Sequence, residues 1–85
     1  MMYDKKVLEI FLENQSQLFE QNVANTLEEA SEFLEDTLAY VAKDYKELKA
    51  YFEENADISG MSKEEILSSA EVFSIPDGRF LIVEG

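Results

Sequence analysis

The sequence predicts an α+β domain in which about four helices pack on a small, mainly antiparallel three-stranded sheet that ends in a C-terminal β-hairpin. Three observations lead to this prediction. Helix-capping patterns recur along the chain, two apolar segments flank a Pro-Asp-Gly turn, and a third apolar segment is available to pair with them. A chain of 85 residues has room for one hydrophobic core, so residues 1–85 are expected to form a single domain.

The first two helices are indicated by their caps and by the spacing of apolar residues. Asp4 can cap a helix whose apolar residues recur with helical spacing through Phe19. Thr26 begins the second helix, because a threonine followed three residues later by Glu29 forms a capping box. We expect this second helix to end near Asp36.

The segment after the second helix allows two interpretations. Apolar residues keep a helical spacing across residues 27–55, which suits one long helix and a mostly α-helical fold with the hairpin added. A charge-free, β-compatible run lies inside this range, however, and Asp44 with Glu47 forms another capping box just after it. We therefore expect a strand over about residues 38–42 and a third helix over residues 45–54, with the long helix as the alternative.

The next segment predicts a turn and a short fourth helix. Residues 55–61 carry oxygen side chains at alternate positions, as a calcium loop does, but the closing glutamate of such a loop is replaced by Ile66. A turn between two helices is the expected structure there. Ser62 and Glu65 form a third capping box, which predicts a helix that ends near Ala70.

The C-terminal hairpin is indicated by two apolar segments on either side of a Pro-Asp-Gly turn. A two-residue Asp-Gly turn would place Phe73 on the same face as Phe80 and Ile82. A three-residue Pro-Asp-Gly loop would instead place Phe73 with Leu81 and Val83. An isolated hairpin is only marginally stable, so a third strand and a helical cover are expected.

Two features favour a surface for binding a partner. The acidic residues of the second helix have no lysine three or four positions away, so they repel one another by roughly 0.2–0.5 kcal/mol per pair. If helices cover only one face of the hairpin, the other face would expose apolar side chains, whereas helices on both faces would bury them. The candidate interaction surface comprises Glu28, Glu29, Glu32, Glu35, Asp36, Val72, Leu81 and Val83.

The acidic run also has an alternative interpretation as a solvated face that keeps the protein soluble. The third helix differs from the second, because Lys43 and Lys49 can pair with Glu47 and Glu53 four residues later. The unbalanced negative charge is therefore expected on the second helix.

Charge and composition exclude several classes of function. Seven basic and nineteen acidic residues give a net charge of −12, which repels nucleic acids and anionic membranes. The chain has no histidine and no cysteine, so the usual imidazole, thiolate and zinc chemistry is absent. We expect no catalytic residue, no metal, no cofactor and no contact with nucleic acid or membrane. The sequence lacks cysteine, a signal peptide and a membrane span, so a cytoplasmic location is expected.

A further set of residues covers nearly the whole chain: Phe11-Leu12, Gln15, Val23-Ala24, Thr26, Glu28-Glu29-Ala30, Phe33-Leu34-Glu35-Asp36, Gly60-Met61-Ser62, Glu64-Glu65-Ile66, Glu71-Val72-Phe73, Pro76-Asp77-Gly78-Arg79, Leu81 and Val83-Glu84. This set resembles a family of small, acidic, uncharacterised single-domain proteins of anaerobic Gram-positive bacteria, which are sometimes automatically labelled glyoxalase. In those relatives the segment matching residues 39–43 is more β-branched, which implies a strand. Glyoxalases bind a divalent metal through His and Glu, and this chain has no histidine, so the resemblance implies no site residue.

The leading hypothesis is a small non-catalytic protein-interaction or regulatory module that binds a protein partner or associates with itself. A homodimer is a reasonable expectation, because a domain of this size buries a limited fraction of its surface. The alternative is a small metal-assisted enzyme of glyoxalase-like type with carboxylate ligands. A further alternative is an acidic mimic of nucleic acid.

Overall fold

The computed structural model describes residues 3–55 and 62–83, and it confirms the α+β prediction. The elements in order are α1 (Lys5–Asn14), the 3₁₀ turn η1 (Gln15–Gln17), α2 (Leu27–Asp36), β1 (Tyr40–Ala42), α3 (Tyr45–Asn55), α4 (Lys63–Leu67), β2 (Val72–Ser74) and β3 (Phe80–Ile82). The strands form an antiparallel sheet in the order β1-β3-β2. The alternative of one helix over residues 27–55 is wrong, because β1 interrupts it.

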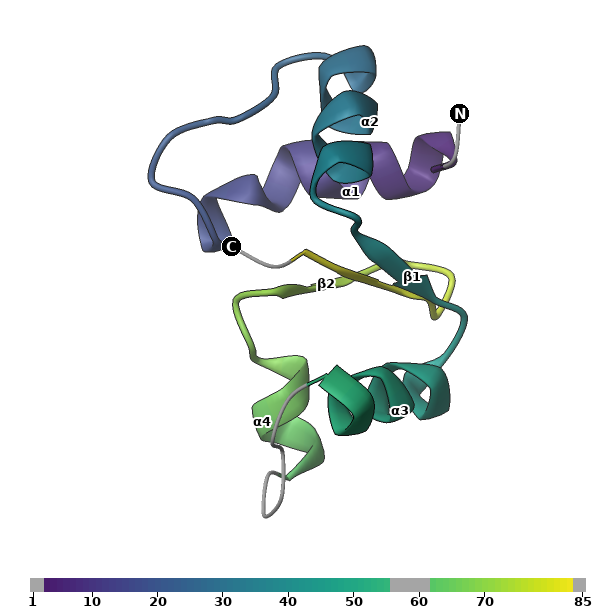
Figure 1. The fold of residues 1–85 in the computed structure, drawn as a ribbon. Helices are drawn as coiled ribbons and strands as arrows, with labels where there is room; N and C mark the ends of the chain where they lie inside the picture. Colours follow the sequence, from purple (N-terminus) through teal and green to yellow (C-terminus); the bar gives the residue numbers. More distant parts are fainter. Residues whose placement is uncertain (1–2, 56–61, 84–85) are drawn as a thin grey trace.

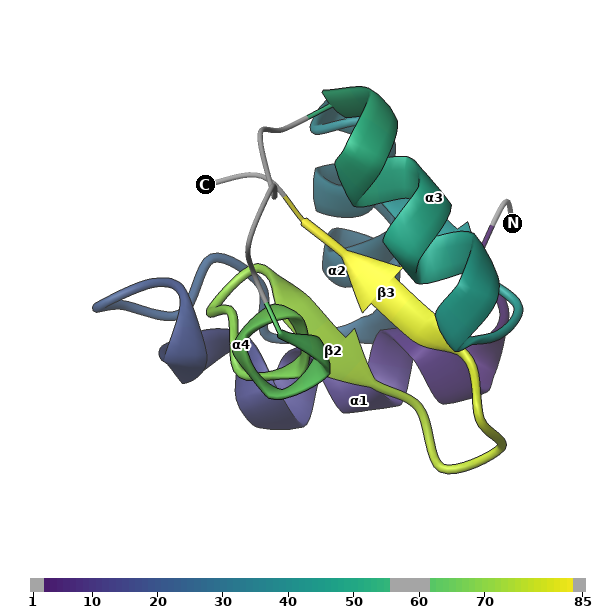
Figure 2. The ribbon, with the colours of Figure 1, turned by 90° about the horizontal axis from the view of Figure 1, so that it is seen from below.

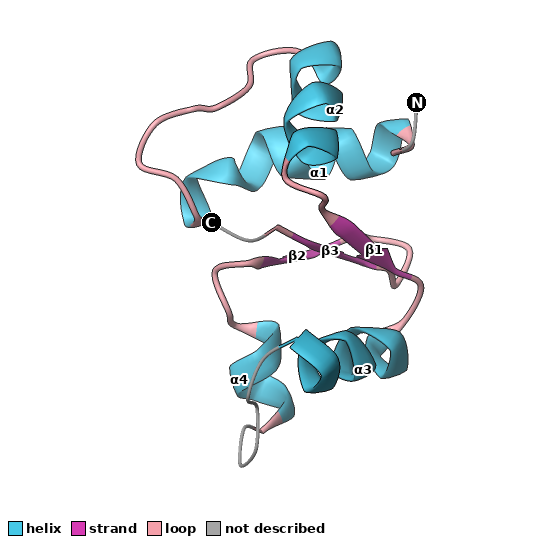
Figure 3. Cartoon of the chain, in the orientation of Figure 1, coloured by secondary structure: helices cyan, strands magenta, loops and turns pink. Residues whose placement is uncertain are grey.

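The sheet is the middle of three layers. Figure 1 shows α1 and α2 on one side of the sheet and α3 and α4 on the other, and Figure 3 marks the same layers by secondary structure. Figure 2, seen from below, shows α3 and α4 in front of the sheet. Helices therefore cover both faces of this small sheet.

Each face of the sheet supports its own buried apolar cluster. The first cluster, on the side of α1 and α2, contains Tyr3, Val7, Leu8, Phe11, Ala24, Ala30, Leu34, Phe73, Ile75, Leu81 and Val83. The second cluster, on the side of α3 and α4, contains Ala42, Leu48, Phe52, Ile66, Val72 and Ile82. Side chains alternate along a strand, so the central strand β3 supplies Leu81 to the first cluster and Ile82 to the second.

The hairpin has the three-residue loop of the two predicted registers. The Ile75 N–H donates to the Arg79 carbonyl at 2.9 Å, and Phe73 pairs with Leu81 across the ladder. Gly78 has φ 97°, a left-handed conformation that glycine adopts without strain. Phe73 and Leu81 therefore share the first cluster, as the three-residue loop requires.

The predicted helix caps are present. Asp4 Oδ1 accepts a hydrogen bond from the Val7 N–H at 3.0 Å, and Thr26 Oγ1 accepts one from the Glu29 N–H at 3.1 Å. Ser62 makes the full reciprocal capping box at the start of α4. Each cap satisfies a backbone N–H group that a helix start leaves without an internal partner.

Three boundaries differ from the predictions. The first helix ends at Asn14, where the chain enters the 3₁₀ turn η1, and does not continue to Phe19. The fourth helix ends at Leu67 and not near Ala70, because the chain tightens at Ser68, whose Oγ donates to the Glu64 carbonyl at 2.8 Å. Strand β1 begins at Tyr40 and not at Leu38, because the backbone of Leu38 is in the left-handed conformation. Residues 56–61, which include most of the segment that resembles a calcium loop, lie outside the described residues.

A leucine in the left-handed region ends α2. The Leu38 N–H donates to the Glu35 carbonyl at 3.2 Å, and the Ala39 N–H donates to the Leu34 carbonyl at 2.9 Å. This pair of bonds is a Schellman motif, in which the position of Leu38 is usually glycine. Leu38 has φ 57°, so it cannot begin a strand, and β1 starts two residues later.

Replacing Leu38 with glycine is expected to raise the free energy of unfolding by about 0.5–1 kcal/mol. A left-handed conformation costs a side chain with a Cβ about 1–2 kcal/mol, and the greater freedom of glycine in the unfolded chain offsets part of that gain. Urea unfolding of both chains measures the difference. Glycine at exposed Ser16, a position without positive φ, is the control and should lower stability. A less stable Leu38→Gly chain would show that the backbone at Leu38 is unstrained.

A buried glutamine holds the long connection between α1 and α2. Gln15 is 3% exposed. Its Nε2 donates to the carbonyls of Leu12 (3.1 Å) and Ala24 (2.9 Å), and its Oε1 accepts from the N–H groups of Val23 (2.8 Å) and Ala24 (3.2 Å). The side chain thereby satisfies backbone groups that no helix or strand satisfies in this connection.

Candidate interaction surface

The outer face of α2 carries the acidic half of the candidate surface. Ala30, Ser31 and Leu34 are buried, and they fix which side of α2 faces the core. The exposed side carries the five acidic residues Glu28, Glu29, Glu32, Glu35 and Asp36. Within residues 3–55 and 62–83, no salt bridge reaches any of these carboxylates. This negative charge is left without a countercharge from the described chain.

Two of the five residues interact with groups elsewhere in the chain. The Glu29 carboxylate accepts a hydrogen bond from the Asn25 N–H at 3.0 Å, which supports the start of α2. Burial, and to a smaller extent the charge of Glu35, raises the pKa of Tyr3. The hydroxyl of Tyr3 donates to the carbonyls of Leu34 and Ala39 beside the end of α2.

Several basic side chains are engaged away from α2. Within the described residues the contacts are Arg79 with Asp4 and Asp77, Lys6 with Asp77 at 4.0 Å, Lys49 with Glu53 at 3.9 Å, and Lys63 over the Tyr45 ring at 4.8 Å. The predicted pair of Lys49 with Glu53 is present. These contacts do not offset the charge of α2.

The second predicted pair on α3 is replaced by another contact. The Glu47 carboxylate accepts hydrogen bonds from the Tyr40 hydroxyl at 2.7 Å and from the Lys43 backbone N–H at 3.3 Å. The bond to Glu47, followed by burial, raises the pKa of Tyr40 to about 12. Glu47 therefore connects α3 to β1, and it does not form the expected salt bridge with the Lys43 ammonium.

The C-terminal end of α2 combines negative charge with an exposed apolar side chain. Glu35 and Asp36 lie in the last turn, which contains no basic residue. Carboxylates at a helix C-terminus are unfavourable, because this end of the helix dipole is negative. Leu38 follows them and is 83% exposed. The sequence prediction missed Leu38, because it placed this residue in the strand; no residue pattern signalled its left-handed conformation.

The hairpin half of the candidate surface is not exposed. Val72 is 4% exposed, and Leu81 and Val83 are 0% exposed. Leu81 and Val83 pack in the first cluster, whereas Val72 packs in the second. Of the two alternatives, helices on both faces is the one observed: the first cluster covers Leu81 and Val83, and the second covers Val72, so these residues form no open apolar face. The structure therefore does not bring the hairpin residues together with the acidic residues.

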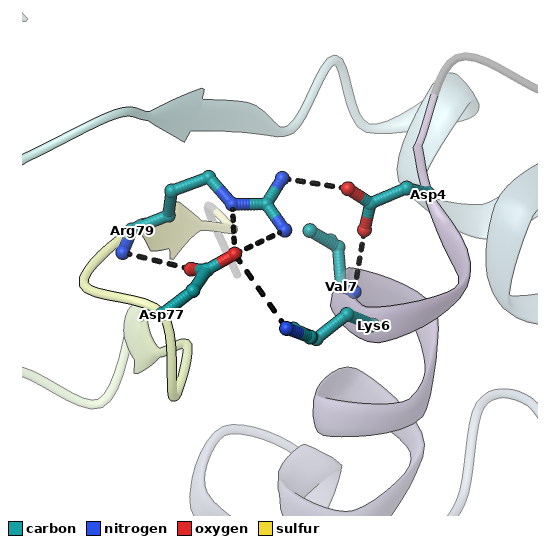
Figure 4. A network of polar contacts seen from close by, with 5 residues as sticks. All are labelled: Asp4, Lys6, Val7, Asp77 and Arg79. Carbon is teal, nitrogen blue, oxygen red and sulfur yellow. Dashed lines mark hydrogen bonds and ion pairs between the residues drawn. The ribbon is translucent and has the colours of Figure 1, made fainter.

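A polar network fixes the hairpin loop against the start of α1. In Figure 4, the Arg79 guanidinium lies between Asp4 and Asp77. Arg79 Nη1 is 2.8 Å from Asp4 Oδ2, and Arg79 Nη2 is 2.8 Å from Asp77 Oδ2. Asp4 also caps α1 through the Val7 N–H, so one side chain links the helix start to the loop.

Replacing Arg79 with glutamine is expected to destabilise the protein near neutral pH but not in acid. The hydrogen bonds from Arg79 hold the pKa values of Asp4 and Asp77 below their ordinary range. A carboxyl group with a lowered folded-state pKa stabilises the protein above its unfolded pKa of about 4, and this contribution is lost as the pH falls through the folded-state value.

Thermal unfolding at about pH 7 and about pH 2 tests this dependence. The difference in melting temperature between the native and Arg79→Gln chains should be present at the higher pH and should disappear at the lower pH. Lys49→Gln removes an exposed ion pair and serves as the control, with little change at either pH. A pH-independent effect of Arg79→Gln would show that packing, and not the two carboxylates, explains the change.

Across residues 3–55 and 62–83, no group of three acidic side chains converges closely enough to hold a metal ion. In the same ranges, no helix has the length and apolar character to cross a membrane.

Comparison with protein-family models, with curated proteins and with solved structures finds no significant match to this chain.

Proposed function

We propose that this protein is a non-catalytic protein-interaction module that binds a basic segment of another protein through the outer face of α2. The observation that supports this proposal most directly is the end of α2. There, Glu35 and Asp36 carry uncompensated charge, and Leu38 exposes most of its side chain at a left-handed backbone position.

The unfavourable interactions within α2 of the free protein also support binding at this surface. Like charges along α2 repel, and the carboxylates of the last turn oppose the helix dipole. Leu38 adds backbone strain and is absent from both apolar clusters. These features lower the stability of the free protein, whereas lysine or arginine side chains of a partner would relieve the repulsion. An apolar group of the partner would bury Leu38, which for a whole leucine side chain contributes about 1.5–3 kcal/mol.

A pull-down from extract of the protein's own cells tests the proposal. The full chain is compared with a variant in which α2 is neutralised by Glu32→Gln, Glu35→Gln and Asp36→Asn. The matched control carries Glu9→Gln, Glu13→Gln and Glu20→Gln, three exposed positions outside α2. Both variants change the net charge by the same amount.

The native chain and the control variant are expected to retain the same basic proteins, and added salt should release them. The α2 variant should lose them. Equal retention by the two variants would point to net charge alone and would contradict a specific role of α2. Retention of nothing above background by the native chain would exclude the proposal.

A further inference from the structure

An uncharged groove lies along the free edge of β2. It has a volume of about 410 Å³ and is bounded by α1, by the connection from α4 to β2, and by β2 itself. This volume is within the range of sites that bind small molecules or short peptide segments. Its lining includes Ile10, Asn14, Gln17, Leu67, Ser69 and Ser74.

The hydrogen-bond pattern of the sheet directs the backbone of Ser74 away from β3. The Ile75 N–H donates to Arg79, and the Val83 N–H donates to Glu71, so residues 71, 73 and 75 face the central strand. Bonding alternates along an antiparallel pair, which turns Val72 and Ser74 toward the outer edge. Both of these residues line the groove.

The chain itself provides hydrogen-bond partners for the backbone N–H and carbonyl of Val72 but not for those of Ser74. The Val72 N–H donates to the Ser69 carbonyl at 3.1 Å, and the Val72 carbonyl accepts from Gln17 Nε2 at 2.8 Å. Within residues 3–55 and 62–83, no turn, loop or side-chain hydrogen bond reaches the backbone N–H or carbonyl of Ser74, and the register gives the bonds to β3 to residues 71, 73 and 75. The groove therefore contains one free backbone donor and one free backbone acceptor, the N–H and the carbonyl of Ser74, oriented as in an unpaired edge strand.

The groove also selects against charge. Nearly a third of the residues in this chain are charged, and its net charge is −12, yet no residue that lines the groove is charged. An anion would meet the repulsion of the whole protein without a local cation, and a cation would find no carboxylate in the lining. The side chains of Asn14, Gln17 and Ser69 offer neutral donors and acceptors, and Ile10 and Leu67 are half-buried apolar neighbours.

We propose that this groove binds an extended, uncharged polypeptide segment of another protein, which pairs with Ser74 as an additional strand at the edge of β2. An extended backbone supplies the complementary N–H and carbonyl groups. Its successive side chains point to opposite faces, so neighbouring side chains can contact Ile10 on the α1 side and Leu67 on the α4 side. The site uses no residue of α2, so it is separate from the acidic surface and takes a partner of different chemistry.

NMR titration of the ¹⁵N-labelled full chain tests the proposal. The probe is the blocked peptide acetyl-Ser-Val-Val-Val-Ser-amide, which carries valine on both faces of an extended strand. Saturable shifts are expected at Ser74, at the side-chain amide of Gln17 and at Ser69, with the amides of α2 unchanged. A probe with N-methylated valines should bind at least about tenfold more weakly, because it lacks the pairing donors. A probe with aspartate at the first and last positions should also bind more weakly.

The N-methylated probe tests the pairing without altering the protein. In the protein, Ser74→Pro removes the donor that β2 contributes to the pairing, so this variant should also bind the peptide more weakly, and proline is tolerated on an edge strand. Absence of saturable shifts at millimolar peptide, equal binding of the N-methylated probe, or shifts centred on Val41 at the opposite edge would each overturn the proposal. Shifts at Ser74 that depend on protein concentration without peptide would assign the edge to a second copy of the chain, which also overturns it.

Discussion

Replacing Phe11 with alanine is expected to lower the free energy of unfolding by about 3–5 kcal/mol. The Phe11 ring is fully buried in the first cluster, where its centroid is 5.7 Å from that of Phe33 and 5.5 Å from that of Phe73. Truncation leaves a cavity that α1, α2 and β2 cannot all close together. A chain of this length has a total stability of only about 4–13 kcal/mol, so a large fraction would be lost.

Urea unfolding followed by far-ultraviolet circular dichroism measures this loss. The control is Phe80→Ala, which removes the same side chain from a half-buried position beside the second cluster. Its effect should be clearly smaller, because less apolar surface returns to water. Equal losses at the two positions, or a loss below about 1 kcal/mol at Phe11, would contradict the central packing role of that ring.

Replacing Gln15 with leucine is expected to lower the free energy of unfolding by about 2–5 kcal/mol. Leucine has a similar volume but makes none of the four hydrogen bonds of Gln15. The N–H and carbonyl of Ala24, a residue only 1% exposed, would then be buried without partners. Each unsatisfied buried group costs about 1–3 kcal/mol.

The matched substitution for this test is Gln21→Leu, an exposed position in the same connection. We expect it to change stability by less than about 0.5 kcal/mol. Hydrogen exchange adds a local measurement, since the Val23 and Ala24 amides should lose protection in the Gln15→Leu chain. Unchanged protection of these amides would mean that the connection keeps its shape without Gln15.

The local features of this fold could be predicted from the sequence. The caps at Asp4, Thr26 and Ser62 depend on groups within a few residues of each other, so a sequence pattern carries the necessary information. Predicting the sheet required only the hairpin and one further apolar segment that could pair with it. The register remained open, because both loop lengths are compatible with Pro-Asp-Gly and only packing of Phe73 in the first cluster selects one.

The non-local features could not be predicted in this way. Gln15 belongs to a polar run that interrupts the apolar stripe of the first helix. Its role is not visible in this pattern, because its partners lie eight and nine residues later in a connection without regular structure. The burial of Leu81 and Val72 depends on which helices cover which face, and short strands do not encode this. The exposure of the acidic side of α2 can be predicted, because helical spacing places these charged residues opposite the buried ones.

The position of β3 in the sheet sets the order in which the protein can mature during synthesis. This strand lies between β1 and β2 but follows both of them in the sequence, and it completes both apolar clusters. While β3 is still inside the ribosome, β1 and β2 have no common neighbour, and neither side of the sheet can close. The complete sheet can therefore form only after Phe80–Ile82 have emerged.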